Sequence, residues 1–398
     1  MKIWVVDQNA NLMYYGYSLC LGLAHQGSEV TLVSRYGYQW QTKPHPRIHL
    51  RGVFSRFSVR LLEKFPFLGK IPLLRTLLKI IEYPFSYIAF FKLLRREEPD
   101  IIHFQYALIP LIDSFVFRRL KKKGIPFVFT VHNIVQPRKI KLNDSFLHWS
   151  YGFVDRFIVH SQANAVEFSR HYGLKNDRIS VIPHGNYNAY ITEANLTQGK
   201  ARQRLDLPPN RPIILFFGII FKFKGLEFLI QALEQASGDQ APLLLVAGKP
   251  ATDFAPYQRE IERLGLQDRV LQRLEFIPNE DLQWYFAACD VVALPYTRIT
   301  QSGVLLTAYS FGKPTVATRV GSFPETVLEG KTGFLADPGD VSSLAQALDK
   351  ALSDPERLAE MSRFTKEHSD REYDWDRIGE KTRALYQEAL SAANRGSN

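Results

Sequence analysis

The sequence predicts an α/β protein of two domains, each a parallel sheet covered by helices. The chain has 398 residues, more than one hydrophobic core usually organises, so two domains of roughly 150 to 200 residues are expected. Short apolar runs alternate with helical segments along the chain, as in strand–helix–strand units. With 45% hydrophobic, 13% aromatic and 23% charged residues, the composition excludes a disordered or fibrous protein.

The first domain is predicted from six strand-like runs, with helical periodicity between several of them. These runs are KIWVVD, EVTLVS, DIIHFQY, PFVFTVHN, RFIVHS and ISVIPHG. A polar stretch from about 188 to 211, with Thr-Gln-Gly-Lys and Pro-Pro-Asn, then predicts a linker.

The same pattern begins again after this stretch, so a second domain of the same class is expected. Its strand-like runs are PIILFFG, LLLVAG, VLQRLEFIP, VVALPY and PTVAT. Repetition of one pattern in both halves is the main reason to expect two similar domains.

Positive charge is concentrated in the first half of the chain. Residues 1–190 hold 26 Lys and Arg against 12 Asp and Glu, and residues 51–98 mix ten cations with four anions and many Phe, Leu and Ile. Such a segment suits an anionic membrane surface. The alternative is a pair of core helices with a solvated basic face. Nucleic acid is disfavoured, because no nucleic-acid module is recognisable and aliphatic residues outnumber stacking aromatics.

The N-terminus and the cysteines favour a cytoplasmic protein, and the basic segment 51–98 favours a peripheral position at the inner face of the membrane. MKIWVVDQN lacks the long apolar core of a secretory signal. Cys20 and Cys289 have no metal-ligand spacing, so neither a disulfide nor a zinc framework is expected. The most apolar later stretch, IIEYPFSYIAFF, is too short to span a bilayer.

Three predicted strand ends in the second domain carry glycines, cations or a helix start. Open parallel sheets bind ligands at these ends, and a helix start offers free backbone N–H groups to a phosphate. Together they predict a site for an anionic ligand, although a Ser-Gly pair taken alone is usually only an ordinary helix cap. The residues are Gly218, Lys222, Lys224, Gly248, Lys249, Ser302, Gly303 and Val304.

The order of motifs resembles the retaining nucleotide-sugar glycosyltransferases of family 4. The resemblance implies the GT-B fold, α/β with two Rossmann-like parallel-sheet domains facing a central cleft. It implies an acceptor domain over 1–190, a donor domain over 191–377 and a closing helix at about 378–394. The motifs are VHN (131–133), VIPHGNY (181–187), FFGIIFKFKG (216–225), FIPNEDLQWYFAACDVVALPY (276–296), FGKPTVAT (311–318), GSFPE (321–325) and GKTGFLADPGD (330–340).

The resemblance also implies roles for individual residues. His132 is expected to contact the donor sugar or the acceptor, and Lys224 to bind the diphosphate together with the helix start at 302–304. Phe276 and Ile277 are expected to line the base pocket. Glu325 is the remaining candidate acid, with a loop or helix-capping role as the alternative. Three further histidines match places that are mostly architectural: His103, His160 and His184.

The chain departs from the family pattern at three places. Two family glutamates correspond to Ile299 and Thr307, and the family arginine corresponds to Ile219 or Phe221. Lys222 and Lys249 are the candidates for supplying the missing charge.

These observations predict a glycosyltransferase that moves a sugar from a nucleotide diphosphate sugar to an acceptor with retention of configuration. The basic, apolar first domain favours a polyprenyl-linked or other lipid-linked acceptor, or a polysaccharide precursor. No metal or other cofactor is expected, because no Asp-x-Asp motif or acidic cluster appears beside a strand end. Two alternatives stay open: a catalytically degenerate subunit or binding module, and a sugar-nucleotide epimerase. The base, sugar, acceptor and oligomeric state are not determined by the sequence.

Overall fold

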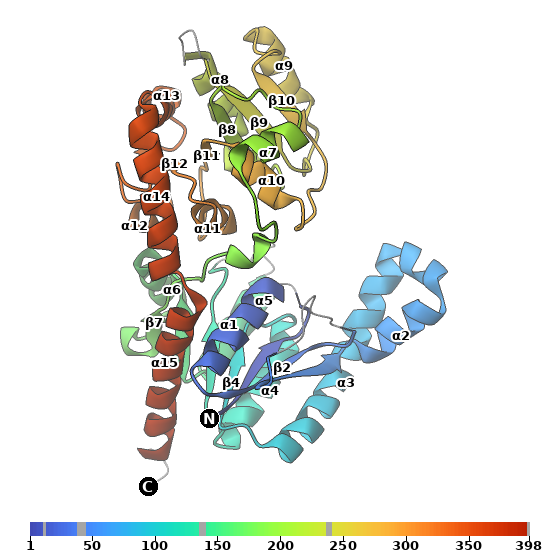
Figure 1. The fold of residues 1–398 in the computed structure, drawn as a ribbon. Helices are drawn as coiled ribbons and strands as arrows, with labels where there is room; N and C mark the ends of the chain where they lie inside the picture. Colours follow the sequence, from blue (N-terminus) through green and yellow to red (C-terminus); the bar gives the residue numbers. More distant parts are fainter. Residues whose placement is uncertain (11–12, 38–44, 135–140, 236–240, 396–398) are drawn as a thin grey trace. The chain divides into compact units, whose positions relative to one another are not determined.

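The computed structural model describes residues 1–10, 13–37, 45–134, 141–235 and 241–395 (Figure 1). The chain divides into two compact units. Unit 1 comprises Met1–Gly185 and Trp375–Asn398, and unit 2 comprises Asn186–Asp374.

Unit 1 is built on a seven-stranded sheet in which every neighbouring pair is parallel. Its order is β3-β2-β1-β4-β5-β6-β7, so the direction of winding reverses between β1 and β4. Strands buried on both faces read as continuous apolar runs, which is why most of them were predictable. They are β1 (Lys2–Asp7), β2 (Glu29–Arg35), β3 (Ile48–Phe54), β4 (Ile101–Phe104), β5 (Phe127–Thr130), β6 (Arg156–Val159) and β7 (Ile179–Val181).

The helices of unit 1 include one contributed by the end of the chain, α15 (Trp375–Arg395). It packs closely on α1, because a Cβ on Gly22 would lie 2.0 Å from the Trp375 carbonyl oxygen and one on Gly379 would lie 2.4 Å from the Gly22 carbonyl carbon. The other helices are α1 (Met13–His25), α2 (Arg56–Lys64), η1 (Pro66–Lys70), α3 (Pro72–Glu97), α4 (Pro110–Lys122), α5 (Lys141–Tyr151), α6 (Gln162–Tyr172) and η2 (Asn176–Arg178).

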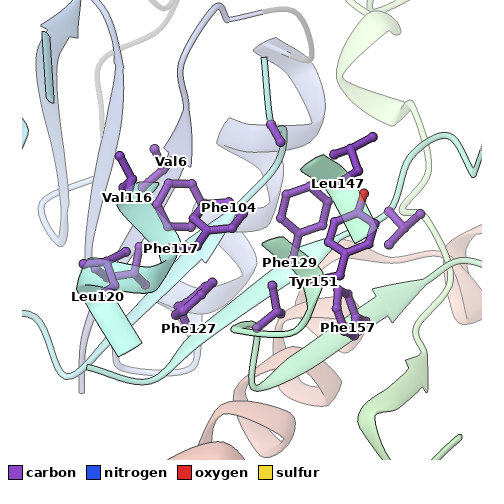
Figure 2. Close-up of a cluster of buried hydrophobic side chains, with 14 of the residues drawn as sticks. Val6, Phe104, Val116, Phe117, Leu120, Phe127, Phe129, Leu147, Tyr151 and Phe157 are labelled. Carbon is purple, nitrogen blue, oxygen red and sulfur yellow. The ribbon is translucent and has the colours of Figure 1, made fainter. Parts of the chain in front are cut away.

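Aromatic side chains dominate the core of unit 1 (Figure 2). The Phe117 ring of α4 packs against Phe104 and Phe127 of the sheet, with ring centroids 4.8 and 5.1 Å apart. Such tilted pairs add to the free energy that burial of the rings already provides. The core therefore fixes the strand ends of β4 and β5, where polar side chains follow.

Unit 2 is built on a six-stranded sheet with order β10-β9-β8-β11-β12-β13, again parallel at each pair. The winding reverses between β8 and β11. The strands are β8 (Ile213–Phe217), β9 (Leu243–Ala247), β10 (Val270–Arg273), β11 (Val291–Leu294), β12 (Thr315–Thr318) and β13 (Gly333–Ala336). The fold class predicted from the sequence, two parallel-sheet α/β domains, is confirmed.

Helices surround the sheet of unit 2, and several begin at side-chain caps. Asp340 accepts a hydrogen bond from Ser343 N at the start of α13, and Asp354 does so from two backbone N–H groups at the start of α14. The helices are η3 (Asn188–Tyr190), α7 (Gln198–Arg204), η4 (Lys222–Lys224), α8 (Leu226–Gln235), α9 (Ala255–Arg263), α10 (Leu282–Ala288), α11 (Gly303–Ser310), α12 (Phe323–Thr326), α13 (Val341–Leu352) and α14 (Pro355–Glu372).

The polar stretch 188–211 is not the linker that its composition predicted. It belongs to unit 2 and contains η3 and α7. The reason is Arg202, only 5% exposed, which donates to Asp290 Oδ2 at 2.7 Å and to the carbonyl of Ala288 at 3.0 Å. Polar residues that complete their hydrogen bonds inside the domain are part of its core.

Candidate functional site

The reversal point between β8 and β11 gathers several of the predicted ligand-binding residues of unit 2. Gly218 directly follows β8, and the loop after β11 leads into α11. Ligands of open parallel sheets bind at such a reversal point, outside the carboxyl ends of the strands. This position therefore carries the candidate donor site.

Gly218 and Lys224, both in the loop after β8, come together with Val304 at the start of α11. Gly218 has a φ of +90°, which favours glycine. A Cβ built on it would lie 3.1 Å from Lys224 Nζ and 3.8 Å from a methyl carbon of Val304. The absence of a side chain at Gly218 thus leaves the ammonium group and the start of α11 beside bare backbone.

Lys224 is a largely buried cation at this position. Its side chain is 9% exposed, its Nζ donates to the Phe217 carbonyl at 3.2 Å, and it lies 5.6 Å from the centre of the Tyr296 ring. Burial lowers the pKa of Lys224 to about 8, because removal from water disfavours the charged form. An anionic ligand would favour the charged form again.

The start of α11 combines a helix cap with a close approach to a tyrosine. Ser302 is buried and accepts a hydrogen bond from Leu305 N at 3.4 Å, and its hydroxyl also pairs with Tyr296. A Cβ on Gly303 would lie 2.9 Å from the hydroxyl oxygen of Tyr187. Ser302 is therefore an N-cap, and the lack of a side chain at Gly303 allows the Tyr187 hydroxyl to approach the start of α11.

The next strand end, after β9, packs directly against Gly218. A Cβ on Gly248 would lie 2.2 Å from the Gly218 carbonyl oxygen, so position 248 requires glycine for this close backbone approach. Lys249 follows Gly248, and Lys222 opens η4; both side chains are exposed. These two cations are thus available in the loops that flank Lys224.

Phe276 and Ile277 lie in the loop after β10 and line a pocket of about 460 Å³. Phe276 is 69% exposed, whereas Ile277 is buried. The pocket is bordered by α7 and α10, where the Arg204 guanidinium lies 4.7 Å from the centre of the Trp284 ring. The Trp284 ring, with the Arg204 guanidinium beside it, provides an aromatic surface on which a planar ring can stack. The base-binding role of Phe276 and Ile277 stays a prediction.

The positions of the missing family glutamates hold residues whose hydrogen bonds and contacts are internal. Thr307 is buried, and its hydroxyl donates to the Gly303 carbonyl at 2.8 Å. The backbone of Ile299 meets the loop at Gly321, whose Cβ would lie 2.0 Å from the Ile299 carbonyl oxygen. Glu325 is exposed in the first turn of α12.

Three residues near these loops were not singled out from the sequence: Tyr187, Tyr296 and Arg298. Tyr187 and Tyr296 flank the start of α11, as described above. The Arg298 guanidinium lies 5.8 Å from the centre of the Phe223 ring, so it is held beside η4. Only Arg298 had a sequence signal, a cation directly after a strand-end segment.

In unit 1, His132 follows β5 and lies among other histidines and aromatic rings. Its Nε2 is 3.0 Å from Gln105 Oε1, and its Nδ1 is 3.4 Å from His160 Nε2. Tyr15, from α1, lies edge-on to His132 with ring centroids 4.8 Å apart. His184 packs on the same Tyr15 ring.

The four predicted histidines are held in the neutral form. Burial lowers the pKa of His160 to about 4 and that of His103 and His184 to about 3. Burial, with the neighbouring histidines, also lowers the pKa of His132 well below its usual value. His103 bonds Tyr386 and Thr130, each at 2.6 Å, as expected of an architectural residue.

A pocket of about 190 Å³ adjoins His132 within unit 1. Gln105, Tyr106 and Asn133 are among its polar lining residues. Gln105 is fully buried, and its Nε2 has no hydrogen-bond partner among the described residues. Such a group is costly unless a ligand or water meets it. The pocket is therefore suited to a small hydroxylated group.

The described residues contain neither a candidate membrane span nor a candidate metal site. No helix among them is both long and apolar enough to cross a membrane. Within the same ranges, no group of three or more His, Cys, Asp or Glu is arranged to hold a metal ion.

Comparisons with known proteins agree with this architecture. Residues 14–185 match the family model described as Glycosyltransferase Family 4, and residues 197–368 match Glycosyl transferases group 1. Two curated relatives are D-inositol 3-phosphate glycosyltransferases. That of Corynebacterium glutamicum is 28% identical over 319 residues, 75% of each chain, and that of Corynebacterium efficiens is 29% identical over 312 residues, 74% of this chain and 72% of the relative.

Two solved structures share the fold over nearly the whole chain. Sucrose-phosphate synthase from Thermosynechococcus elongatus has a TM-score of 0.73 at 20% identity, and Anabaena HepE in complex with UDP has a TM-score of 0.71 at 21% identity. Each alignment covers 98% of this chain and 100% of the other. The chain therefore belongs to the family 4 glycosyltransferases with the GT-B fold, enzymes that transfer a sugar from a nucleotide-sugar donor.

Proposed function

We propose that this glycosyltransferase transfers a sugar, with retention of configuration, to a lipid-linked acceptor or polysaccharide precursor at an anionic membrane surface. The main support for a nucleotide-sugar site in unit 2 is the position of Lys224 Nζ. It lies 3.1 Å from the Cβ position of Gly218, which is also close to Val304. It lies at the reversal point of the sheet, where a diphosphate is best received.

The chemistry requires stabilisation of the departing diphosphate. Lys224 supplies a charge in a site of low solvent exposure, where electrostatic interactions are stronger than in water. The N–H groups at the start of α11, around Ser302 to Val304, supply further donors. Lys222 and Lys249 are proposed to add the positive charge that the family arginine would supply.

His132 is proposed to contact the donor sugar or the acceptor from unit 1. The support is the adjoining pocket of about 190 Å³ with the unpaired amide nitrogen of Gln105. Because burial keeps His132 neutral, its ring is expected to orient hydroxyl groups by hydrogen bonds and not to act as a fixed cation.

UDP-glucose is the first donor to test, since Anabaena HepE has been solved with UDP-glucose. The acceptor is less constrained. The curated relatives are named for D-inositol 3-phosphate, a small phosphorylated polyol, whereas the basic and apolar segment 51–98 favours a lipid-linked acceptor. Both classes belong in the screen.

The experiment measures binding by calorimetry and turnover by release of nucleotide, across UDP, GDP, ADP and dTDP sugars with and without these acceptors. We expect saturable binding of one donor class, with acceptor-dependent release and an α-linked product from an α-linked donor. Binding without turnover on every acceptor would instead favour a degenerate binding module. Interconversion of donor sugars without acceptor would favour an epimerase.

A further inference from the structure

The helical hairpin formed by α2, η1 and α3 exposes an unusual amount of apolar surface. Among the described residues, eighteen large hydrophobic side chains are exposed, and ten of them lie between Phe57 and Ile88. Figure 1 shows α2 and α3 side by side, with their outer turns standing away from the sheet of unit 1. A contiguous exposed apolar surface of this kind marks an interaction site.

On α3 the exposed apolar residues form one continuous stripe. Leu73, Leu77, Ile81, Phe85 and Ile88 recur every three or four residues, so they lie on the same face of the helix. Leu73 is 80% exposed. The spacing continues into Lys92 and Arg95, both exposed. An apolar stripe that ends in cations is typical of a helix lying at a membrane interface.

Cations also line α2, and the acidic residues of the hairpin are partly engaged elsewhere. Arg56, Arg60 and Lys64 are exposed at intervals of four residues. Glu82 accepts hydrogen bonds from Phe57 N at 2.5 Å and Ser58 N at 2.8 Å, at the start of α2. Glu97 is paired with Arg51 at 2.9 Å and with Arg96 at 3.3 Å. Glu63 and Glu98 are also exposed, but the exposed cations of this segment outnumber them, so the surface is apolar with an excess of positive charge.

The inner face of α3 is attached to the rest of unit 1 by hydrogen bonds from Tyr83 and Tyr87. Tyr83 and Tyr87 donate to Asp113 Oδ1 at 2.6 and 2.5 Å. Tyr87 also lies 3.5 Å from Gln8 Nε2, which donates to the Tyr106 carbonyl at 2.9 Å. These bonds connect α3 to the ends of β1 and β4, the strand ends next to the pocket by His132.

The positive charge of the hairpin surface distinguishes between two possible partners, a second copy of the chain and a lipid bilayer. A second copy docked through this face would bring the cations of two hairpins together, which is unfavourable. An acidic lipid bilayer offers negative headgroups for the cations and an apolar interior for the stripe. We propose that the α2–η1–α3 hairpin docks unit 1 on anionic phospholipid, with the stripe Leu73 to Ile88 inserted between the headgroups.

This inference rests on the proposed function in one respect, the lipid-linked acceptor. Docking through the hairpin would hold the β1 and β4 ends in a fixed orientation to the membrane, because the Tyr83–Tyr87–Asp113 bonds connect the two. An acceptor sugar carried on a lipid would then approach the pocket beside His132 from a constant direction.

The test is flotation of the full chain with vesicles of phosphatidylcholine, alone or with phosphatidylglycerol. We expect binding only with the acidic lipid, and binding that weakens as salt rises, since ions screen such attraction. The triple variant Arg56→Gln, Arg60→Gln, Lys64→Gln should bind roughly a hundredfold more weakly, from the usual contribution of each surface cation. The variant Leu77→Ser, Ile81→Ser, Phe85→Ser should also lose binding.

A matched control is Val166→Ser on α6, which removes another exposed apolar side chain of unit 1 and should bind as the parent does. Circular dichroism and the melting temperature establish that each variant folds. Nucleotide-sugar binding, measured on the same samples, is expected to be unchanged, so failure of the donor-site proposal and failure of docking are distinguishable. Equal flotation with neutral and acidic vesicles, no flotation, or self-association that the stripe variant abolishes would each overturn the docking proposal.

Discussion

Nε2 of His160 lies 3.4 Å from Nδ1 of His132, and this nitrogen of His160 can only accept a hydrogen bond. The reason is that Nδ1 of His160 lies 3.0 Å from the Ile182 carbonyl oxygen, which requires a hydrogen on Nδ1. Burial keeps His160 neutral, with a pKa of about 4. On its other side, His132 faces Gln105 Oε1. A neutral His132 thus has one hydrogen for two acceptors.

The first prediction concerns the tautomer of His132. Replacement His160→Phe keeps a ring of similar size but removes one acceptor, so His132 should carry its hydrogen on Nε2, toward Gln105. The parent should show a mixture of both neutral tautomers. Nitrogen-15 chemical shifts of the imidazole ring distinguish the two forms.

The variant His160→Gln is the matched control, because its amide oxygen restores an acceptor. His160→Gln should restore the mixture of His132 tautomers and the turnover number of the parent. His160→Phe should change the turnover number more than the Michaelis constant for the donor. Identical nitrogen shifts in the parent and His160→Phe would show that His160 does not influence His132.

The second prediction concerns Lys224. Lys224→Ala should weaken nucleotide binding by about 1.5 to 3 kcal/mol, the usual range for a hydrogen bond to a charged group, which is roughly tenfold to hundredfold in the dissociation constant. Lys350→Ala, a cation in the last turn of α13, is the control. Calorimetric titration with UDP measures both, and unchanged affinity in folded Lys224→Ala would remove Lys224 from the site.

The third prediction concerns pH. The pKa of Lys224 in the free protein is about 8 because of burial, and a bound diphosphate should raise it. Above pH 8 the free side chain is mostly neutral, so nucleotide binding should take up about one proton and affinity should fall as pH rises. The nucleotide itself is fully ionised there, since its last phosphate pKa is about 6.

Titrations in two buffers of different ionisation enthalpy measure this uptake. We expect almost none at pH 7 and about one proton at pH 9. The variant Lys224→Met keeps an unbranched side chain without the titrating group and should show no uptake at either pH. Uptake that persists in Lys224→Met would assign the proton to another residue.

Most of the fold was predictable because parallel strands are buried on both faces and therefore read as apolar runs. Two strands were missed. β3 (Ile48–Phe54) is the edge strand of its sheet and carries His49 and Arg51, so its sequence lacks an apolar run. β13 (Gly333–Ala336) is also an edge strand, and its residues stand between the glycines and other turn residues of GKTGFLADPGD, so no separate apolar run is visible.

The site was predictable only where it depends on local sequence. Gly218 and Lys224 belong to one strand-end loop, so their neighbourhood follows from the chain. The approach of Tyr187 to Gly303, and of His160 to His132, joins loops from different strands. The sequence of a loop does not specify which other loop it contacts, because that depends on the order of the strands in the sheet.

The fourth prediction concerns the stability of unit 2. Arg202→Ala should cost about 3 to 5 kcal/mol, the range for removing one partner of a buried ion pair, because Asp290 would lose its guanidinium partner at 2.7 Å. Arg204→Ala, whose nearest carboxylate is 3.8 Å away with exposed side chains, should cost under about 1 kcal/mol. Calorimetric melting compares the two, and equal costs would show that the Arg202 pair is not important for folding.

The fifth prediction separates two roles of Ser302. As an N-cap, Ser302 is replaceable by Asp, whose oxygen accepts the same hydrogen bond and whose charge suits a helix start. If a diphosphate also binds there, the new carboxylate occupies the place of a phosphate oxygen, and repulsion in a poorly solvated site should sharply lower donor affinity. The melting temperature should stay near that of the parent.

Thr197→Asp provides the matched control, because Thr197 caps α7 by accepting from Lys200 N. That change should leave both the melting temperature and the nucleotide affinity as they are. A Ser302→Asp variant that melts normally and binds nucleotide tenfold or more weakly supports the phosphate site. A variant that melts normally and keeps its affinity would mean that the start of α11 is a cap alone, and that Lys224 holds the diphosphate with other donors.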